Sequence, residues 1–212
     1  MSGVEVRRLS ATELRERLDD LAEVLRDCVE GGASVRFMAP FSQQDARAAF
    51  EAVAPDVESG RRILLAAFAD GVLVGTVQVV HASQPNSPHR GDVAQLLVHR
   101  QARRRGIARR LMERVEAEAA REGKTLLVLD TVTGDPAERL YERLEWTKVG
   151  VIPNYALYPD GRPCDTTVFW KALSQPPDHA GVRRASDSCQ TRARLESETS
   201  QRRVRDESDT RA

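Results

Sequence analysis

Residues 92–122 read DVAQLLVHRQARRRGIARRLMERVEAEAARE, and this stretch decides the fold. Its first part, DVAQLLV, has the alternating, β-rich pattern of a strand that stops where the charges begin. In its last part the apolar residues recur at helical spacing, which predicts a helix with one buried face formed by Ile107, Leu111, Met112 and Val115. The stretch therefore predicts a strand, a basic turn and a helix, in that order.

The basic turn between strand and helix predicts a site for an anion such as a phosphate group. Gly106 stands where the turn becomes the helix, and a glycine there allows a ligand to approach the backbone. The free N–H groups of the first helical turn and the helix dipole both favour negative charge. The sequence of the turn fits neither GxxxxGK[ST] nor GxGxxG, so it is not one of the common nucleotide-binding loops.

The turn instead resembles the acyl-CoA loop of the GNAT acetyltransferases, Q/R-x-x-G-x-G/A, with Arg103, Gly106 and Ala108 at the defining positions. Other segments are similar to the branch of this family that contains the tabtoxin-resistance acetyltransferases. These segments are GGASVRFM, LDTVTGDPAERLYERLEW, VGVIPNYALYPDGRP and DTTVFWKAL. The resemblance covers residues 4–173 and implies an acetyl-CoA-dependent N-acetyltransferase.

Composition narrows the class of protein. The 212 residues include 32 basic and 32 acidic side chains, and this balance argues against a nucleic-acid partner. No apolar run approaches the ~20 residues of a membrane span and residues 1–10 do not form a signal peptide, so we expect a cytoplasmic protein without a membrane partner. The three cysteines and four histidines lack ligand spacing, so we expect neither a disulfide framework nor a metal site.

The rest of the chain predicts a mixed α/β domain. Strands are expected at residues 5–9, 63–69, 72–80, 92–98, 125–131, 147–152 and 166–172. One helix is expected to begin at the capping box Ser10–Glu13 and to continue to Gly31-Gly32. A second is expected from Ser42 to near Pro55, and a short one is expected to begin at Asp135. These elements give the GNAT fold, a twisted and largely antiparallel sheet of about seven strands with helices on both faces. Its central parallel pair is splayed to admit acyl-CoA.

Two parts of the chain differ in character. Residues 1–173 are predicted to form the acetyltransferase domain. Residues 174–212 contain no Ile, Phe, Tyr, Trp or Met, so they cannot bury enough apolar surface to offset their ordering entropy. We therefore predict a disordered, polar and charged tail.

The resemblance implies how acetyl-CoA is held. Its pantetheine arm is expected to pair with the backbone of residues 96–98, and its pyrophosphate with N–H groups of residues 104–109. The expected cofactor-binding residues are Leu96, Leu97, Val98, Arg103, Arg104, Arg105, Gly106, Ile107, Ala108, Arg109 and Ala137.

Acetyl transfer to an amine needs a base for the amine and an acid for the departing thiolate. Tyr141 occupies the position where GNAT enzymes often keep a tyrosine that donates to the CoA sulfur, although a core aromatic would also suit it. Asp130 and Asp92 are the candidate bases. A lone aspartate, with a pKa of ~3.9, is poorly matched to an alkylammonium near ~10.4, and two acids close together would reduce this mismatch. A turn cap and a solvated charge, respectively, are the alternative interpretations of the two aspartates.

The acceptor is expected to be a small-molecule amine, such as an antibiotic or a β-lactam-bearing amino acid, with a role in resistance or detoxification. Its expected contacts are Ser34, Arg36, Phe37 and Tyr155. A peptide amine is a second acceptor class, and a catalytically silent acyl-CoA-binding protein is a further alternative. The sequence is compatible with a monomer or a homodimer.

Overall fold

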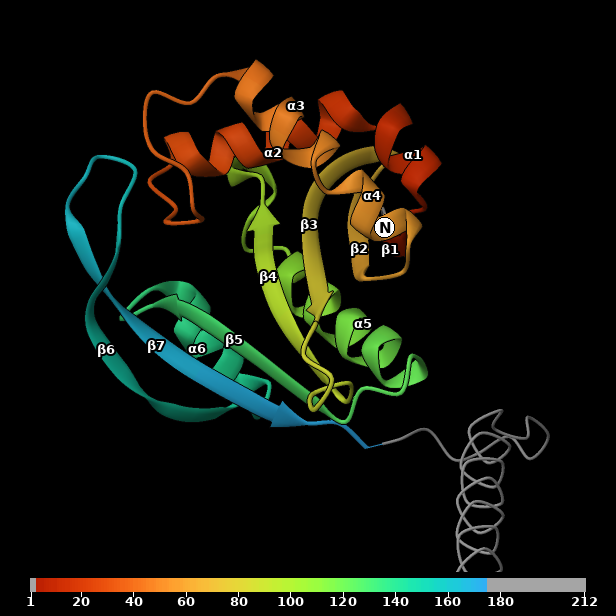
Figure 1. Ribbon diagram of the computed structural model, residues 1–212. Coiled ribbons are helices and arrows are strands. Elements are labelled where there is room, and N and C mark those ends of the chain that lie inside the picture. Colours follow the sequence, from red (N-terminus) through yellow and green to blue (C-terminus); the bar gives the residue numbers. More distant parts are fainter. Residues whose placement is uncertain (1–2, 175–212) are drawn as a thin grey trace, which may run out of the picture. The chain divides into compact units, whose positions relative to one another are not determined.

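A computed structural model describes residues 3–174, which form one seven-stranded sheet with helices (Figure 1). The strands are β1 (Val4–Arg8), β2 (Arg62–Ala69), β3 (Val72–His81), β4 (Arg90–Val98), β5 (Leu126–Val132), β6 (Thr147–Leu157) and β7 (Pro163–Ala172). The helices are α1 (Ala11–Glu16), α2 (Leu18–Glu30), α3 (Gln43–Glu51), α4 (Ala54–Glu58), α5 (Ile107–Arg121) and α6 (Pro136–Arg143), with a 3₁₀ turn, η1, at Arg100–Ala102.

The strand order is β1-β2-β3-β4-β5-β7-β6. Every neighbouring pair is antiparallel except β4 and β5, which are parallel and connected through α5. This arrangement confirms the predicted mixed α/β fold with a single parallel pair near the middle of the sheet.

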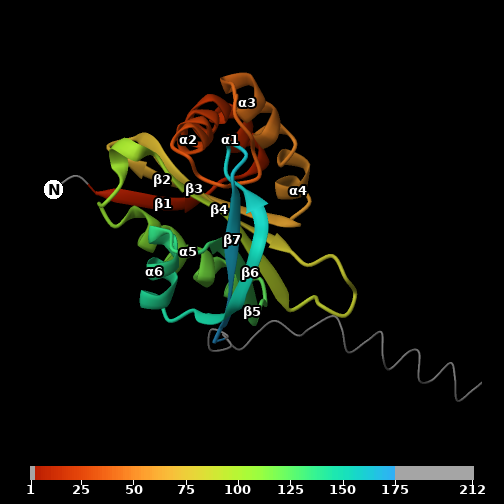
Figure 2. The ribbon, with the colours of Figure 1, turned by 90° about the vertical axis from the view of Figure 1, so that its left-hand side faces the viewer.

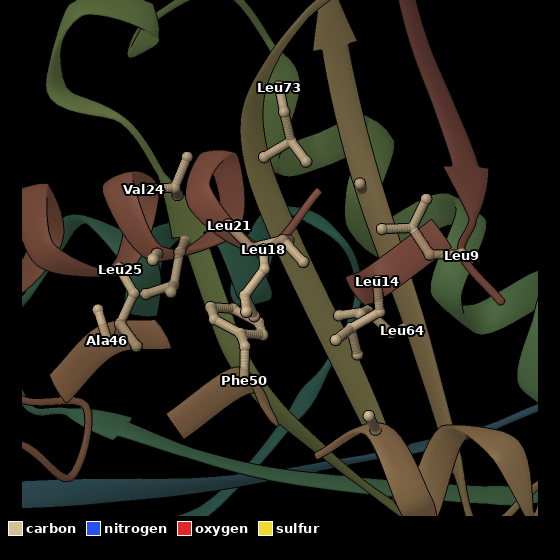
Figure 3. Packing of buried hydrophobic residues seen from close by; sticks show 14 of the residues in the cluster. Leu9, Leu14, Leu18, Leu21, Val24, Leu25, Ala46, Phe50, Leu64 and Leu73 are labelled. Carbon is tan, nitrogen blue, oxygen red and sulfur yellow. The ribbon is translucent and has the colours of Figure 1, made fainter. Parts of the chain in front are cut away.

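Two hydrophobic clusters cover the two faces of the sheet. The first joins α1–α4 to one face, with Leu14, Leu21, Phe50 and Leu64 among its fully enclosed side chains (Figure 3). The second joins α5 and α6 to the opposite face. Figure 2 shows α1–α4 on one side of the strands and α5 and α6 on the other. A ligand bound between two separated strands can therefore contact α1–α4 on one face of the sheet and α5 and α6 on the other.

The helix cap and the hairpin turn that local sequence signals predicted are both present. The Ser10 side chain accepts from the N–H of Glu13, and the Glu13 carboxylate accepts from the N–H of Ser10, which completes the capping box that begins α1. Between β2 and β3, Asp70 and Gly71 have φ values of 52° and 79°. Two consecutive positive φ values are the requirement of the tight hairpin turn that Asp-Gly favours.

Three predicted boundaries were wrong. The helix that begins after Ser10 is interrupted at Arg17, whose φ and ψ of −103° and 18° separate α1 from α2. Pro55 lies in the first turn of α4, where its missing N–H costs nothing, instead of ending the preceding helix. The last hairpin is longer than predicted, because β6 and β7 remain paired as far as Leu157 and Pro163.

Some predictions fall outside the described residues. The predicted disordered tail, residues 174–212, lies there apart from Ser174, as do His179 and Cys189. Cys28 and Cys164 are buried free thiols. No helix within residues 3–174 is both long and apolar enough to cross a membrane.

Candidate active site

The site begins where the parallel pair separates. Backbone pairing between β4 and β5 covers only Arg90–Asp92 and Leu126–Val128. Beyond that point the strands diverge (Figure 1), so residues 93–98 and 129–132 face each other without a shared ladder. Backbone N–H and C=O groups need partners, and these two edges can offer theirs to an extended ligand.

A bulge in β4 contributes to the separation. Thr76 pairs with Leu97 while Gln78 pairs with Ala94, so β4 carries one more residue than β3 across this interval. Gln95 lies within the bulge and has a φ of 50°, which is uncommon for a residue other than glycine. A bulge bends a strand and increases its twist, as is seen here where β4 leaves β5.

A pocket of about 1180 Å³ occupies this opening. Its lining comes from the loop after α2, the second half of β4, the turn that leads into α5, the end of β5 together with α6, and the β6–β7 hairpin. Its volume exceeds the range of about 300–1,000 Å³ that is usual for small-ligand pockets. The pocket can therefore hold a large cofactor together with a second reactant.

The N-terminus of α5 is built for an anion. Gly106 precedes the helix with a φ of 76° and provides no side-chain cap, so the first N–H groups of the helix keep their hydrogen-bonding capacity for a ligand. The first turn of α5 carries no acidic residue, whereas α1, α2, α3, α4 and α6 each have at least one there. A β-carbon added at Gly106 would meet no atom within 4 Å, so space remains for a phosphate beside the backbone.

A buried carboxylate on α2 fixes the start of this turn. Asp27 accepts from the backbone N–H of Arg100 at 2.7 Å and from its Nε at 2.8 Å. Burial alone would raise the pKa of Asp27, but the hydrogen bonds from Arg100 and the nearby His99 lower it overall. Asp27 is therefore charged at neutral pH and ties the turn to the helical layer.

Tyr141 reaches the pocket from the face covered by α5 and α6. Its ring packs against Trp146 and Phe169, with centroids 6.1 and 5.8 Å away. Burial raises the pKa of the Tyr141 hydroxyl above its ordinary value, and the charges of Asp130 and Asp135 raise it further. The hydroxyl therefore stays protonated at physiological pH and can act as a proton donor.

Asp130 faces the other side of the opening. Leu127 and Leu129 point into the cluster that contains Tyr141, and side chains alternate along a strand, so Asp130 lies on the face of α1–α4. The opening thus has a carboxylate on one side and a tyrosine hydroxyl on the other.

The pocket brings together most of the predicted cofactor residues. Those lining it are Leu96, Leu97, Val98, Arg103, Arg104, Gly106, Ile107, Ala108, Arg109 and Ala137. Arg105 is exposed and is not part of the lining.

The predicted catalytic residues are divided. Tyr141 and Asp130 line the pocket, but Asp92 does not. Asp92 lies opposite Val128, where β4 and β5 are still paired, and its carboxylate is 3.6 Å from Nε of Arg90. The predicted pair of aspartates is therefore absent from the pocket lining, because the parallel register keeps Asp92 at the closed end.

The predicted acceptor contacts are divided too. Ser34 and Arg36 line the pocket. Phe37 packs instead against Phe41, with centroids 4.6 Å apart, and against the first cluster. Tyr155 is 58% exposed on β6, the edge strand, and does not line the pocket.

Several lining residues were not predicted, among them Gln95, Asp135, Arg139 and Tyr158. Gln95 had a visible signal, a polar residue amid the apolar part of a central strand. Asp135 precedes α6, Arg139 lies within α6 and Tyr158 follows β6, and only the tertiary structure brings these three residues to the pocket.

Comparisons with known proteins agree with this geometry. Residues 19–146 match the Acetyltransferase (GNAT) family. An uncharacterized N-acetyltransferase from the hisH-hisA intergenic region of Azospirillum brasilense is 31% identical over 132 residues, which cover 61% of this chain and 76% of that protein.

Solved structures share the fold. YncA from Salmonella typhimurium, determined with its cofactor acetyl-CoA, has a TM-score of 0.67 at 21% identity over 84% of this chain and 100% of its own. An N-acetyltransferase from Staphylococcus aureus has a TM-score of 0.68 at 19% identity, over 82% and 100% of the two chains. A ribosomal-protein-alanine N-acetyltransferase from Brucella melitensis has a TM-score of 0.65 at 20% identity, over 80% and 99%. Together with the family match, the open parallel pair and the uncapped start of α5 lead to one conclusion: this chain belongs to the GNAT family of acetyltransferases, whose co-substrate is acetyl-CoA.

Proposed function

We propose that the protein transfers the acetyl group of acetyl-CoA to the primary amine of a small molecule. The choice of a small acceptor is supported by hydrogen bonds that close the acceptor side of the pocket. The loop after α2 and the β6–β7 hairpin are joined there by hydrogen bonds, which leaves less room for an extended chain than an open groove would.

Two hydrogen bonds make this closure. The hydroxyl of Ser34 donates to the carbonyl oxygen of Leu157 at 2.7 Å. The backbone N–H of Ala39 donates to the carbonyl oxygen of Pro159 at 2.9 Å. Both link the loop after α2 to the far end of the hairpin. A peptide acceptor would need these contacts to open, whereas a compact amine would not.

The residues present fit acetyl-CoA. The backbone of residues 96–98 can pair with the amide groups of pantetheine, and the N–H groups at the start of α5 can hold the pyrophosphate. Arg103 and Arg104 add positive charge beside these N–H groups. When bound, acetyl-CoA supplies an activated acetyl group.

In the proposed reaction, a group on each face of the opening handles a different proton. The acceptor arrives as an alkylammonium and loses two protons, one to free the nitrogen lone pair before attack and one as the C–N bond replaces the C–S bond. The sulfur gains one proton and the other is released to solvent. Asp130, exposed at the acceptor side, attracts the alkylammonium and relays its protons to water, since a lone aspartate without a second acid beside it is poorly matched to direct proton transfer. The buried, protonated Tyr141 donates to the sulfur from the opposite face.

We further propose a role in resistance to, or detoxification of, an antibiotic or toxin amine, on the basis of the sequence segments that resemble the tabtoxin-resistance branch. We propose that the protein performs it in the cytoplasm, as a monomer or a homodimer. The ribosomal-protein-alanine N-acetyltransferase from Brucella melitensis has a name that indicates a protein acceptor, but at 20% identity its likeness to this chain concerns the fold alone. A peptide acceptor is therefore an outcome that the test has to resolve.

The test is a free-thiol assay with acetyl-CoA and two matched sets of acceptors. One set contains small primary amines, including amine antibiotics, and the other contains hexapeptides with free N-termini. We expect thiol release with members of the first set and kcat/KM values at least tenfold lower for the peptides. Preference for the peptides would refute the choice of acceptor. Binding of acetyl-CoA without thiol release from any amine would indicate a silent acyl-CoA-binding protein.

A further inference from the structure

A chain of hydrogen bonds runs across the sheet and ends at the pocket. It starts at Asp56 on α4, whose Oδ2 lies 3.4 Å from an Nη atom of Arg62. The other Nη of Arg62 donates to Oε1 of Gln78 at 2.6 Å, and Nε2 of Gln78 donates to Oε1 of Gln95 at 2.6 Å. Gln78 is fully buried and does not line the pocket, whereas Gln95 does.

The bond between Arg62 and Gln78 fixes which end of each glutamine amide faces which neighbour. A guanidinium has only donors, so the atom of Gln78 that faces Arg62 must be its amide oxygen. The amide nitrogen of Gln78 then faces Gln95 and requires an oxygen there. The remaining polar atom of Gln95 is its amide nitrogen, so the Gln95 side chain has N–H donors left for a ligand.

The position of Gln95 in the pocket lining lets these donors reach a bound acceptor. Gln95 lies in the β4 bulge, where the strand turns away from β5. Its bond to Gln78 keeps its side chain on the face of α1–α4, because Gln78 pairs with Leu64 of the first cluster. Asp130 lies on that same face across the opening. Gln95 and Asp130 therefore flank the acceptor side, with a neutral donor on one strand and a carboxylate on the other.

We infer that Gln95 is an acceptor-binding residue and that the pocket selects amines with a hydrogen-bond-accepting oxygen close to the amine. Asp130 attracts the ammonium group, and the amide N–H of Gln95 donates to a carbonyl, carboxylate or hydroxyl oxygen of the same molecule. Gln78 and Arg62 are positioning residues that keep the donor end of Gln95 toward the pocket. This inference rests on the proposed function and specifies its substrate class.

Two variants reverse the polarity of Gln95 by different routes. Gln95→Glu keeps an oxygen for Gln78 but presents a carboxylate oxygen to the pocket in place of an N–H. Gln78→Glu leaves the pocket lining unchanged. The new carboxylate can accept from Arg62 but cannot donate to Gln95, so the Gln95 amide turns its nitrogen toward position 78 and its oxygen toward the pocket.

The experiment compares leucinamide with isoamylamine, which lacks the whole carboxamide group. Because the carboxamide lowers the pKa of the neighbouring amine, kcat/KM is calculated for the unprotonated form of each amine. We expect the wild-type kcat/KM to favour leucinamide about tenfold or more, since a lost hydrogen bond leaves a polar group unpaired. Both variants should abolish this preference, mainly through a higher KM for leucinamide. The KM for acetyl-CoA serves as the control in Gln78→Glu, where it should remain unchanged because position 78 lies outside the pocket lining.

The outcomes separate the two claims. A leucinamide preference of equal size in the wild type and both variants would overturn the inference and leave the proposed function intact. Loss of the preference in Gln95→Glu alone would overturn the positioning roles of Gln78 and Arg62. Absence of thiol release from both amines, while another small amine is acetylated, would overturn the inference and leave the proposed function intact. Absence of thiol release from every small amine, despite bound acetyl-CoA, would overturn both.

Discussion

Gly106 offers a direct perturbation of the phosphate site, because the same helix contains a matched control. Gly106 precedes α5 with a φ of 76°, and Gly123 follows α5 with a φ of 77°. An added β-carbon would meet no atom within 4 Å at either position. Replacing either glycine by alanine therefore imposes the same backbone strain without a clash, but only Gly106 lines the pocket.

Backbone strain should lower the stability of both variants, whereas a lost contact with the cofactor should raise Kd in Gly106→Ala alone. A left-handed conformation costs a residue with a β-carbon about 1–2 kcal/mol, so both variants should lose roughly that much stability. For a domain of this size, that loss lowers Tm by about 2–8 °C. A charge-assisted hydrogen bond contributes about 1.5–3 kcal/mol, so losing one contact with the pyrophosphate raises Kd by about 10- to 150-fold.

The assay is calorimetric titration of acetyl-CoA into the wild type, Gly106→Ala and Gly123→Ala, alongside thermal melting. We expect similar melting temperatures for the two variants and weaker binding only in Gly106→Ala. Equal affinities in all three proteins would refute the assignment of this turn. Equal weakening in both variants would show that strain in α5, and not contact with the cofactor, controls binding.

The remaining predictions concern proton transfer and acid stability. Tyr141→Phe should lower kcat by about 10²–10⁴-fold and leave acetyl-CoA affinity unchanged, and steady-state kinetics with calorimetry would show whether it does. Asp130→Asn should raise the KM of the amine or remove the acid limb of the pH–rate profile, whereas Asp92→Asn, outside the pocket lining, should behave like the wild type; an equal effect of both would contradict the separation of the two aspartates. The pKa of Glu13 is lowered to about 2 by the backbone N–H of Ser10 and by Arg7, so its contribution to stability is complete above its ordinary pKa of 4.5 and disappears as the pH falls toward 2. Melting temperatures between pH 5 and pH 2 should therefore fall less in Glu13→Gln than in the wild type, and parallel curves would refute this.

Much of the fold could be predicted because local signals and periodicity agreed. The hairpin at Asp70-Gly71 and the strand–turn–helix unit at residues 92–122 depend on residues close in sequence, and both formed as expected. The break at Arg17 could not be predicted, because the apolar spacing of Leu14, Leu18 and Leu21 continues across it.

The site was predicted less completely, since it depends on register and on strand geometry. The sequence places Asp92 and Asp130 at the ends of two strands, but only the pairing of β4 with β5 shows that Asp92 lies at the closed end. The bulge that directs Gln95 arises from a mismatch between β3 and β4, which neither strand encodes alone. Gly106 was predictable because a positive φ before a helix requires no distant partner.

The central claim is that acetyl-CoA is held between β4 and β5 with its pyrophosphate at the start of α5. A crystal structure of the protein with acetyl-CoA tests it most directly. We expect pyrophosphate oxygens within hydrogen-bonding distance of the N–H groups of residues 106–109, and a pantetheine arm between residues 93–98 and 129–132. A cofactor bound elsewhere on the domain, or none bound at saturating concentration, would contradict it.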